Sequence, residues 1–168
     1  MISRERNKRK GITFHFEAPG DIAPATLDQV QALVRKGGAV GASFVRENLR
    51  NAFLIGYAQD PEDRVIGTVI LKNQKDHYRR RIESATGLDL SGYLERGYTA
   101  VTPEWRGRGV AGELIRGLIE RSRDQKVYVT IHLDNGPALR LTRKNGMTLA
   151  GRFFNQRTGR EIGVFINR

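Results

Sequence analysis

The stretch Glu104–Gly112, with the sequence EWRGRGVAG, decides the fold of this chain. Its glycines satisfy two phosphate-binding patterns at once. Gly107–Gly112 matches the dinucleotide pattern G-x-G-x-x-G, and Arg106–Ala111 matches a different loop, Arg-x-x-Gly-x-Ala. In both patterns, backbone N–H groups and the positive end of a following helix face phosphate oxygens. The rest of the chain therefore has to discriminate between them.

The flanking residues predict an α+β domain whose central sheet is mixed, mostly antiparallel and flanked by helices. Strands are expected from alternating residues at 12–17 and from apolar runs beside turn residues elsewhere, and helices from apolar residues at helical spacing. In chain order we expect a strand at 12–17, helices at 24–36 and 43–50, and a hairpin of 52–59 with 64–72. A less regular segment with a helix near 76–84 follows. The rest is a strand at 96–102, a helix from 111, a strand at 127–133, a helix at 137–144 and a hairpin of 147–154 with 160–167. Among these, 96–133 is the one strand–helix–strand crossover.

The dinucleotide pattern has one supporting feature and three against it. In its favour, Asp134 follows the next strand at about the offset of a ribose-binding acid. However, Thr102–Arg106 separates the strand from Gly107, whereas the dinucleotide fingerprint sits in a tight turn directly after its strand. The 34 residues after Asp134 are too few to complete a doubly wound parallel sheet, and the elements before the motif are antiparallel hairpins. These features favour the second pattern.

Two spaced segments, YTAVTPEWRGRGVAGELIRGLIE at 98–120 and NGPALRLTRKNGM at 135–147, resemble the GNAT (general control-related) N-acetyltransferase superfamily. Its first signature, Arg/Gln-x-x-Gly-x-Gly/Ala, is matched by Arg106, Gly109 and Ala111. Its second, Asn-x-x-Ala-x-x-Leu-Tyr-x-x-x-Gly-Phe, is matched by Asn135, Ala138, Leu141 and Gly146, whereas Thr142 replaces the tyrosine and Met147 the phenylalanine. The resemblance implies a GNAT-like single domain.

The resemblance also implies acetyl-CoA as cosubstrate. The expected binding residues are Ala100, Val101, Arg106, Gly107, Arg108, Gly109, Val110, Ala111, Asn135 and Ala138. The loop from Arg106 to Ala111 would bind the pyrophosphate, and backbone groups of Ala100 and Val101 would pair with the pantetheine arm, with one N–H polarising the thioester carbonyl. Asn135 either contacts the arm or caps the following helix. No metal is expected, since the three histidines have no ligand spacing.

For catalysis the resemblance points to Glu95, Tyr98 and Thr142. Glu95 occupies the position of the base in the histone-acetylating branch, or is an ordinary exposed carboxylate. Tyr98 either relays a proton through water or packs the sheet. Thr142 stands where the family's tyrosine protonates the leaving thiolate. An alkyl hydroxyl is too weak an acid to do so. Tyr128 either substitutes for that tyrosine or packs in the core.

The chain has 168 residues, a formal charge of +11 and no cysteine. The charge attracts phosphate-rich partners, whether a nucleotide cofactor, RNA or an anionic surface. Lack of cysteine favours a cytoplasmic protein, and we expect neither an export signal nor a membrane span. We expect a flexible basic arm at 1–10 and the acyltransferase domain at 11–168, with an irregular insertion at 73–94 near the acceptor site.

The sequence thus predicts an N-acyltransferase that moves an acetyl group from acetyl-CoA to an amine in a ternary complex, because no cysteine can carry the acyl group. The insertion carries Tyr78-Arg79-Arg80-Arg81, which indicates either an acidic or RNA-linked acceptor or a solvated helix face. Two alternatives remain: a catalytically weak GNAT-like protein that binds acyl-CoA or RNA, and a nucleotide-dependent oxidoreductase. A monomer or a homodimer is expected, with no membrane partner.

Overall fold

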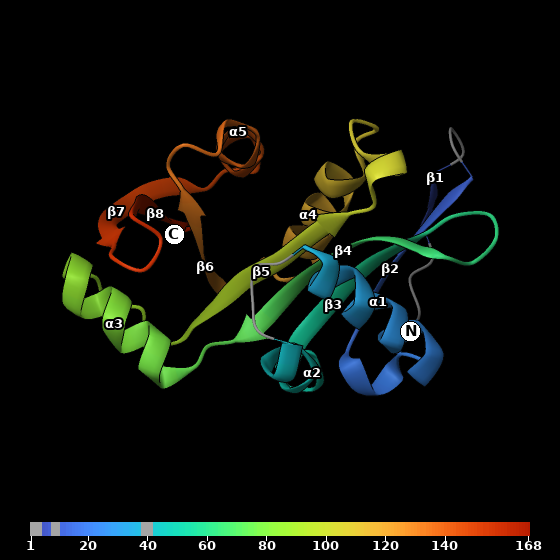
Figure 1. Cartoon of the computed structure of the whole chain (residues 1–168), viewed down its shortest axis with the longest axis horizontal. Helices are drawn as coiled ribbons and strands as arrows, with labels where there is room; N and C mark the ends of the chain where they lie inside the picture. Colours follow the sequence, from blue (N-terminus) through green and yellow to red (C-terminus); the bar gives the residue numbers. More distant parts are fainter. Residues whose placement is uncertain (1–4, 8–10, 38–41) are drawn as a thin grey trace. The chain divides into compact units, whose positions relative to one another are not determined.

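The computed structural model of this chain describes residues 5–7, 11–37 and 42–168. They form two compact units (Figure 1). The first comprises Met1–Lys72 and Gly97–Arg123, and the second comprises Asn73–Arg96 and Asp124–Arg168. Strand β5 (Tyr93–Val101) contributes its first four residues to the second unit and the rest to the first.

In the first unit, the strands lie in the order β1 (Glu5–Asn7), β2 (Ile12–Glu17), β3 (Ala52–Gln59), β4 (Val65–Asn73) and the end of β5. The pairs β1–β2, β2–β3 and β3–β4 are antiparallel. The helices are α1 (Pro24–Lys36), α2 (Ala42–Arg50) and α4 (Val110–Arg121), with two 3-10 turns at Pro19–Asp21 and Pro103–Trp105. Figure 1 shows α1 and α2 on one face of these strands and α4 on the other.

Helices α1 and α2 bury their apolar sides against the sheet. The shared core contains Val30, Leu33 and Val34 of α1, Val45 and Leu49 of α2, and Ile55, Tyr57 and Ile70 of the strands. Tyr98 and Ala100 of β5 pack against the same cluster. The core of this unit therefore supports the part of β5 that leads to the glycine loop.

On the opposite face, α4 packs on the strands through small residues. The ring of Phe16 occupies the space left by Gly117 of α4 and Gly56 of β3, because a Cβ at either glycine would crowd it. The Arg121 guanidinium lies 4.2 Å from the centroid of the Phe16 ring, a cation–π contact. This close packing fixes the position of α4 on its sheet.

We expect Gly117→Ala to lower the free energy of unfolding by about 1–3 kcal/mol, the usual range for overpacking a core. The cause is overlap between the new Cβ and the Phe16 ring. Urea denaturation measures the effect, and the Phe16→Leu background is the control. If the clash is the cause, the alanine costs less in that background; equal costs in both backgrounds would exclude it.

The second unit has the strand order β5, β6 (Lys126–His132), β8 (Arg160–Ile166) and β7 (Thr148–Asn155). Strands β5 and β6 are parallel and pair over Tyr93–Glu95 and Lys126–Tyr128, whereas β6–β8 and β7–β8 are antiparallel. Helix α3 (Asp76–Thr86) packs Ile82 against Tyr128 and Val164. Helix α5 (Gly136–Lys144) buries Leu139 and Thr142.

The α+β class and the mixed, mostly antiparallel sheet agree with the sequence prediction, and the predicted helices and strands are present within a few residues. Two details concern the expected arm and the expected insertion. Residues 5–7 of the expected arm form β1, while 1–4 and 8–10 lie outside the described residues. The helix expected near 76–84 within the less regular 73–94 segment is α3, which runs two residues further than expected. None of the helices in the described ranges has the length and apolar character needed to cross a bilayer.

Candidate active site

The glycine loop follows β5 and leads directly into α4. Gly107 and Gly109 have φ of 69° and 81°, in the left-handed region that favours glycine. A Cβ at either position would meet no other atom within 4 Å, and residues 106–109 are exposed. The loop therefore keeps its curvature through backbone conformation and leaves this surface open to a ligand.

Two arginine side chains hold the loop at its base. Arg106 Nε donates to the Val101 carbonyl oxygen at 3.0 Å, which ties the loop to the end of β5. The Arg108 guanidinium lies 5.0 Å from the centroid of the Trp105 ring. Both guanidinium groups thus stay beside the loop and contribute positive charge there.

The N-terminus of α4 begins at the loop. Gly109 is the N-cap and has no side chain to cap the helix, and the Glu113 N–H donates the first helical hydrogen bond to the Gly109 carbonyl oxygen. The N–H groups of Val110, Ala111 and Gly112 consequently lack helical acceptors, as at any helix start. Val110 packs close to Gly67 of β4, where a Cβ would clash with it. The helix end is thereby held against β4 and β5, with its positive dipole directed to the loop.

Tyr98 has an unusual backbone conformation within β5. Its φ is 50°, rare for a bulky residue and costly by roughly 1–2 kcal/mol. Asn48 Nδ2 donates to the Tyr98 hydroxyl at 2.5 Å, and Lys72 Nζ lies 4.5 Å from the ring centroid. These contacts, with the packing of Tyr98 against the α1–α2 core, favour sheet packing as its role.

Glu95 lies on the face of the second unit that α3 covers. It is only 9% exposed and is the register partner of the fully buried Tyr128. Burial, followed by the negative charge of Glu95, raises the pKa of Tyr128 above its usual value. The Tyr78 hydroxyl hydrogen-bonds Thr130 Oγ1 at 3.2 Å, and burial also raises its pKa. Glu95 is thus a buried carboxylate among phenols, not an ordinary exposed one.

Thr142 is 1% exposed, and its Oγ1 accepts a hydrogen bond of 2.7 Å from Arg96 Nη2. Arg96 is itself 4% exposed, and its Nε and Nη1 have no hydrogen-bond partner within the described part of the chain. Burial lowers the pKa of Arg96 to about 10. The sequence prediction missed Arg96, although consecutive charges at 95 and 96 inside an apolar strand indicate that one charge points to each face.

At the start of α5, Asn135 Oδ1 accepts from the Ala138 N–H at 3.2 Å. The side chain of Asn135 is therefore the N-cap of α5, one of its two expected roles. Asp134 forms two hydrogen bonds with Arg160, of 2.6 and 3.0 Å. The acid that supported the dinucleotide pattern is thus engaged in an ion pair.

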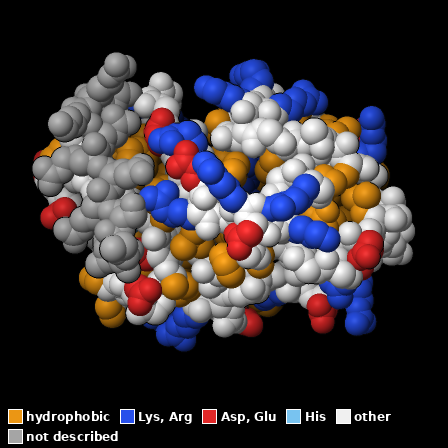
Figure 2. Space-filling view, turned by 180° about the vertical axis from the view of Figure 1, so that it is seen from behind, with side chains coloured by type: hydrophobic (Ala, Val, Ile, Leu, Met, Phe, Trp, Pro, Cys, Tyr) orange, Lys and Arg blue, Asp and Glu red, His pale blue; other side chains and the backbone are white. Residues whose placement is uncertain are grey.

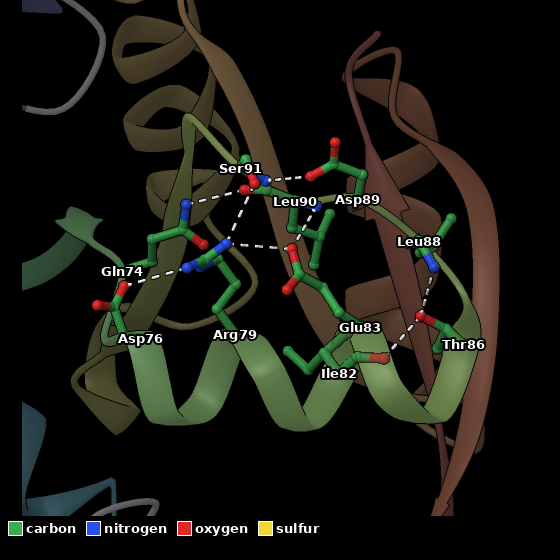
Figure 3. Close-up of polar contacts among 10 residues, drawn as sticks. All are labelled: Gln74, Asp76, Arg79, Ile82, Glu83, Thr86, Leu88, Asp89, Leu90 and Ser91. Carbon is green, nitrogen blue, oxygen red and sulfur yellow. Dashed lines mark hydrogen bonds and ion pairs between the residues drawn. The ribbon is translucent and has the colours of Figure 1, made fainter.

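The segment from Asn73 to Ser91 is organised by polar contacts around Arg79 (Figure 3). The Arg79 guanidinium contacts Asp76, Glu83 and Ser91 at 3.1–3.3 Å. Glu83 accepts from the Leu90 N–H at 2.8 Å, and Gln74 donates to the Leu90 carbonyl at 2.8 Å. These bonds attach the loop after α3 to the helix itself.

The four residues 78–81 of the basic run in α3 consequently differ in their surroundings. Tyr78 and Arg79 point into contacts of the second unit, while Arg80 and Arg81 are exposed. Figure 2 shows the Lys and Arg side chains of one face scattered among acidic and apolar ones. The case for an acidic or RNA-linked acceptor therefore depends on two arginines of this run rather than three.

The expected site residues fall into two groups. The first unit brings together Tyr98, Ala100, Val101 and the loop residues Arg106 to Ala111, and the second unit holds Glu95, Asn135, Ala138 and Thr142. Glu95 and Tyr98 lie on the same strand, three residues apart. By the resemblance, the first group would mainly bind acetyl-CoA, and the second would include the catalytic positions Glu95 and Thr142.

Solved structures of similar fold include NAA60 from Arabidopsis thaliana in complex with acetyl-CoA, with 19% identity, coverage of 92% of this chain and 98% of that chain, and a TM-score of 0.68. The ribosomal-protein-S18-alanine N-acetyltransferase from Escherichia coli has 13% identity, covers 91% of both chains and has a TM-score of 0.65. A GNAT-family acetyltransferase from Streptococcus agalactiae has 15% identity, coverage of 91% and 94%, and a TM-score of 0.68. Likeness at these identities shows the fold.

No curated protein sequence gives a significant match to this chain. A family match does exist, to the acetyltransferase (GNAT) family, over residues 31–147. It includes residues of both units and both signature segments, from the core of α1 to Met147. Since the match spans more than half of the 168 residues, this chain belongs to the acetyltransferase (GNAT) family.

Proposed function

We propose that this chain is an N-acyltransferase that moves the acetyl group of acetyl-CoA to an amine by direct attack in a ternary complex. The observation that carries the proposal is the exposed loop 106–109, whose glycines have positive φ and which leads into the N-terminus of α4. Such a loop supplies backbone N–H groups, a helix dipole and nearby guanidinium groups to a pyrophosphate. Membership of the acetyltransferase family supports acetyl-CoA as the donor.

In the proposed reaction the amine nitrogen attacks the thioester carbonyl carbon, and Glu95 accepts the proton that the amine loses. A buried carboxylate suits this role, because it is shielded from bulk water and sits in a fixed position beside Tyr128. The resemblance assigns polarisation of the carbonyl oxygen to a backbone N–H, that of Val101. The Arg106 side chain donates a hydrogen bond to the Val101 carbonyl oxygen. The direction of the Val101 N–H is set by the backbone of β5, whose last residue is Val101.

Ligand-induced stabilisation tests cosubstrate binding. Acetyl-CoA and CoA at about 100 times their dissociation constant are expected to raise the unfolding free energy by ~2.7 kcal/mol. Thermal denaturation with acetyl-CoA, CoA and NAD measures this. NAD is the control, because stabilisation by NAD instead of a CoA species would favour the oxidoreductase alternative. Absence of any shift with either CoA species would contradict the proposed function.

Turnover distinguishes an enzyme from a binding protein. Thr142 supplies no acid for the leaving thiolate, which favours a catalytically weak acyl-CoA-binding protein as the second candidate. The Escherichia coli neighbour is a ribosomal-protein-alanine N-acetyltransferase, so a peptide with a free N-terminus is the first acceptor to assay. A panel of peptides, lysine, polyamines and a tRNA pool, each with acetyl-CoA, separates the two candidates. Binding without transfer to any acceptor would favour the second.

A further inference from the structure

The Arg96 guanidinium is the most unusual charged group in the second unit. It is 96% buried, since 4% is exposed, and Nη2 alone has a hydrogen-bond acceptor, Thr142 Oγ1 at 2.7 Å. Nε and Nη1 are buried without a hydrogen-bond acceptor, and within the described ranges no carboxylate forms an ion pair with this side chain. A buried cation with unused donors is expensive to maintain unless an anion reaches it.

The proposed reaction generates one such anion. When the C–S bond of the thioester breaks, its electron pair moves to sulfur and produces a thiolate. Tyr128 is a poor proton donor for that thiolate, because burial and the Glu95 charge raise its pKa above its usual value. Thr142 is an alkyl alcohol and a poorer donor still. Neither of the two hydroxyl groups can thus neutralise the sulfur by giving up a proton.

We infer that Arg96, oriented by Thr142, stabilises the departing CoA thiolate as an ion pair in place of a proton donor. This inference rests on the proposed function. The balance is complete: Glu95 takes the proton that converts the ammonium into the neutral amine, the nitrogen forms the C–N bond, the C–S electron pair goes to sulfur, and the second proton lost by nitrogen goes to water. The thiolate then leaves with its charge compensated by the guanidinium and takes a proton from water after release.

The position of Arg96 in β5 fits this division of roles. Consecutive residues of a strand point to opposite faces. Glu95 points to the α3 face beside Tyr128, and Arg96 points to the α5 face at Thr142. The proton acceptor and the cation therefore act from the two sides of one strand, so that they do not neutralise each other.

The test is titration of the CoA thiol in its complex with the protein, followed by the ultraviolet absorbance of the thiolate. In the wild-type complex we expect the thiol pKa to lie at least one unit below its ordinary ~8.5. In Arg96→Met it should return to the ordinary value, and Arg96→Lys should give an intermediate one. A shift of one unit is a tenfold change, so kcat for acetyl transfer should fall about tenfold or more in Arg96→Met.

Arg143 provides the matched control, since it is an exposed arginine of α5 next to Thr142. Arg143→Met removes the same charge and should leave the thiol pKa unchanged. Thr142→Val, which removes the orienting acceptor but keeps the charge, should reduce the shift only in part. Apo Arg96→Met should unfold at an equal or higher temperature, because an uncompensated buried charge has been removed.

The outcomes separate this inference from the proposed function. If wild-type protein binds no CoA, the proposed function fails. If CoA binds and its thiol titrates identically in wild type and Arg96→Met, the proposed function stands and the role of Arg96 is wrong. If Arg96→Met does not fold, the Lys and Thr142→Val variants decide: thiol pKa values equal to wild type in both would overturn the inference.

Discussion

Glu95→Gln is expected to lower kcat for acetyl transfer by about 10²–10⁴-fold, the usual contribution of a general base. The amide has nearly the same shape as the carboxylate but does not accept the amine proton. Because Glu95 is buried beside Tyr128, the neutral side chain should fit the same space. Steady-state kinetics with saturating acetyl-CoA measure kcat, and the KM for acetyl-CoA should change little.

The pH dependence of kcat distinguishes a general base from a residue with a structural role at position 95. Amines such as an N-terminus or lysine, with pKa values of about 8 and 10, are mostly protonated at pH 7. As the pH rises toward the pKa of the acceptor, more of the amine is already neutral, and the deficit of Glu95→Gln should shrink. Glu161→Gln is the control, since Glu161 is an exposed glutamate of β8 in the same unit. A kcat for Glu95→Gln within about twofold of wild type would remove Glu95 as the base.

The sequence was informative about this fold where local pattern and global arrangement agree. Helix α4 follows from the apolar spacing after the loop, and the hairpin of β3 with β4 follows from two apolar runs that flank a Pro-containing turn. The loop conformation was also predictable, because only glycine adopts the positive φ of Gly107 and Gly109 without strain. These features depend on neighbours along the chain.

Features that depend on distant partners were not predicted. Tyr98 adopts a positive φ that its sequence disfavours, and contacts with Asn48 and Lys72, far away in the chain, accompany it. The hydrogen bond between Arg96 and Thr142 joins residues 46 positions apart. Pairing of β1 with β2 likewise overrides the basic composition of the N-terminal residues. Tertiary context decides each of these, and local propensity cannot report it.

Gly109→Asp is expected to weaken acetyl-CoA binding by about 10²–10³-fold, since juxtaposed like charges cost several kcal/mol. Gly109 is the N-cap of α4 at φ 81°, and a Cβ there would meet no other atom within 4 Å. Asp tolerates the left-handed conformation better than other residues and is a favoured N-cap, so the protein should stay folded. The added carboxylate would nevertheless occupy the surface proposed for the pyrophosphate.

The matched variant Gly109→Asn separates charge from shape, because Asn has the size, backbone tolerance and capping ability of Asp without its charge. Isothermal titration should therefore give Gly109→Asn a much smaller loss of affinity than Gly109→Asp. Gly159, at φ 65° in the β7–β8 turn, also has an open position for a Cβ. Gly159→Asp adds the same charge at a left-handed glycine outside the loop and should leave affinity unchanged. Equal affinities for Gly109→Asp and Gly109→Asn would show that no phosphate lies at this helix end, because a negative ligand group there must respond to the sign of the new charge.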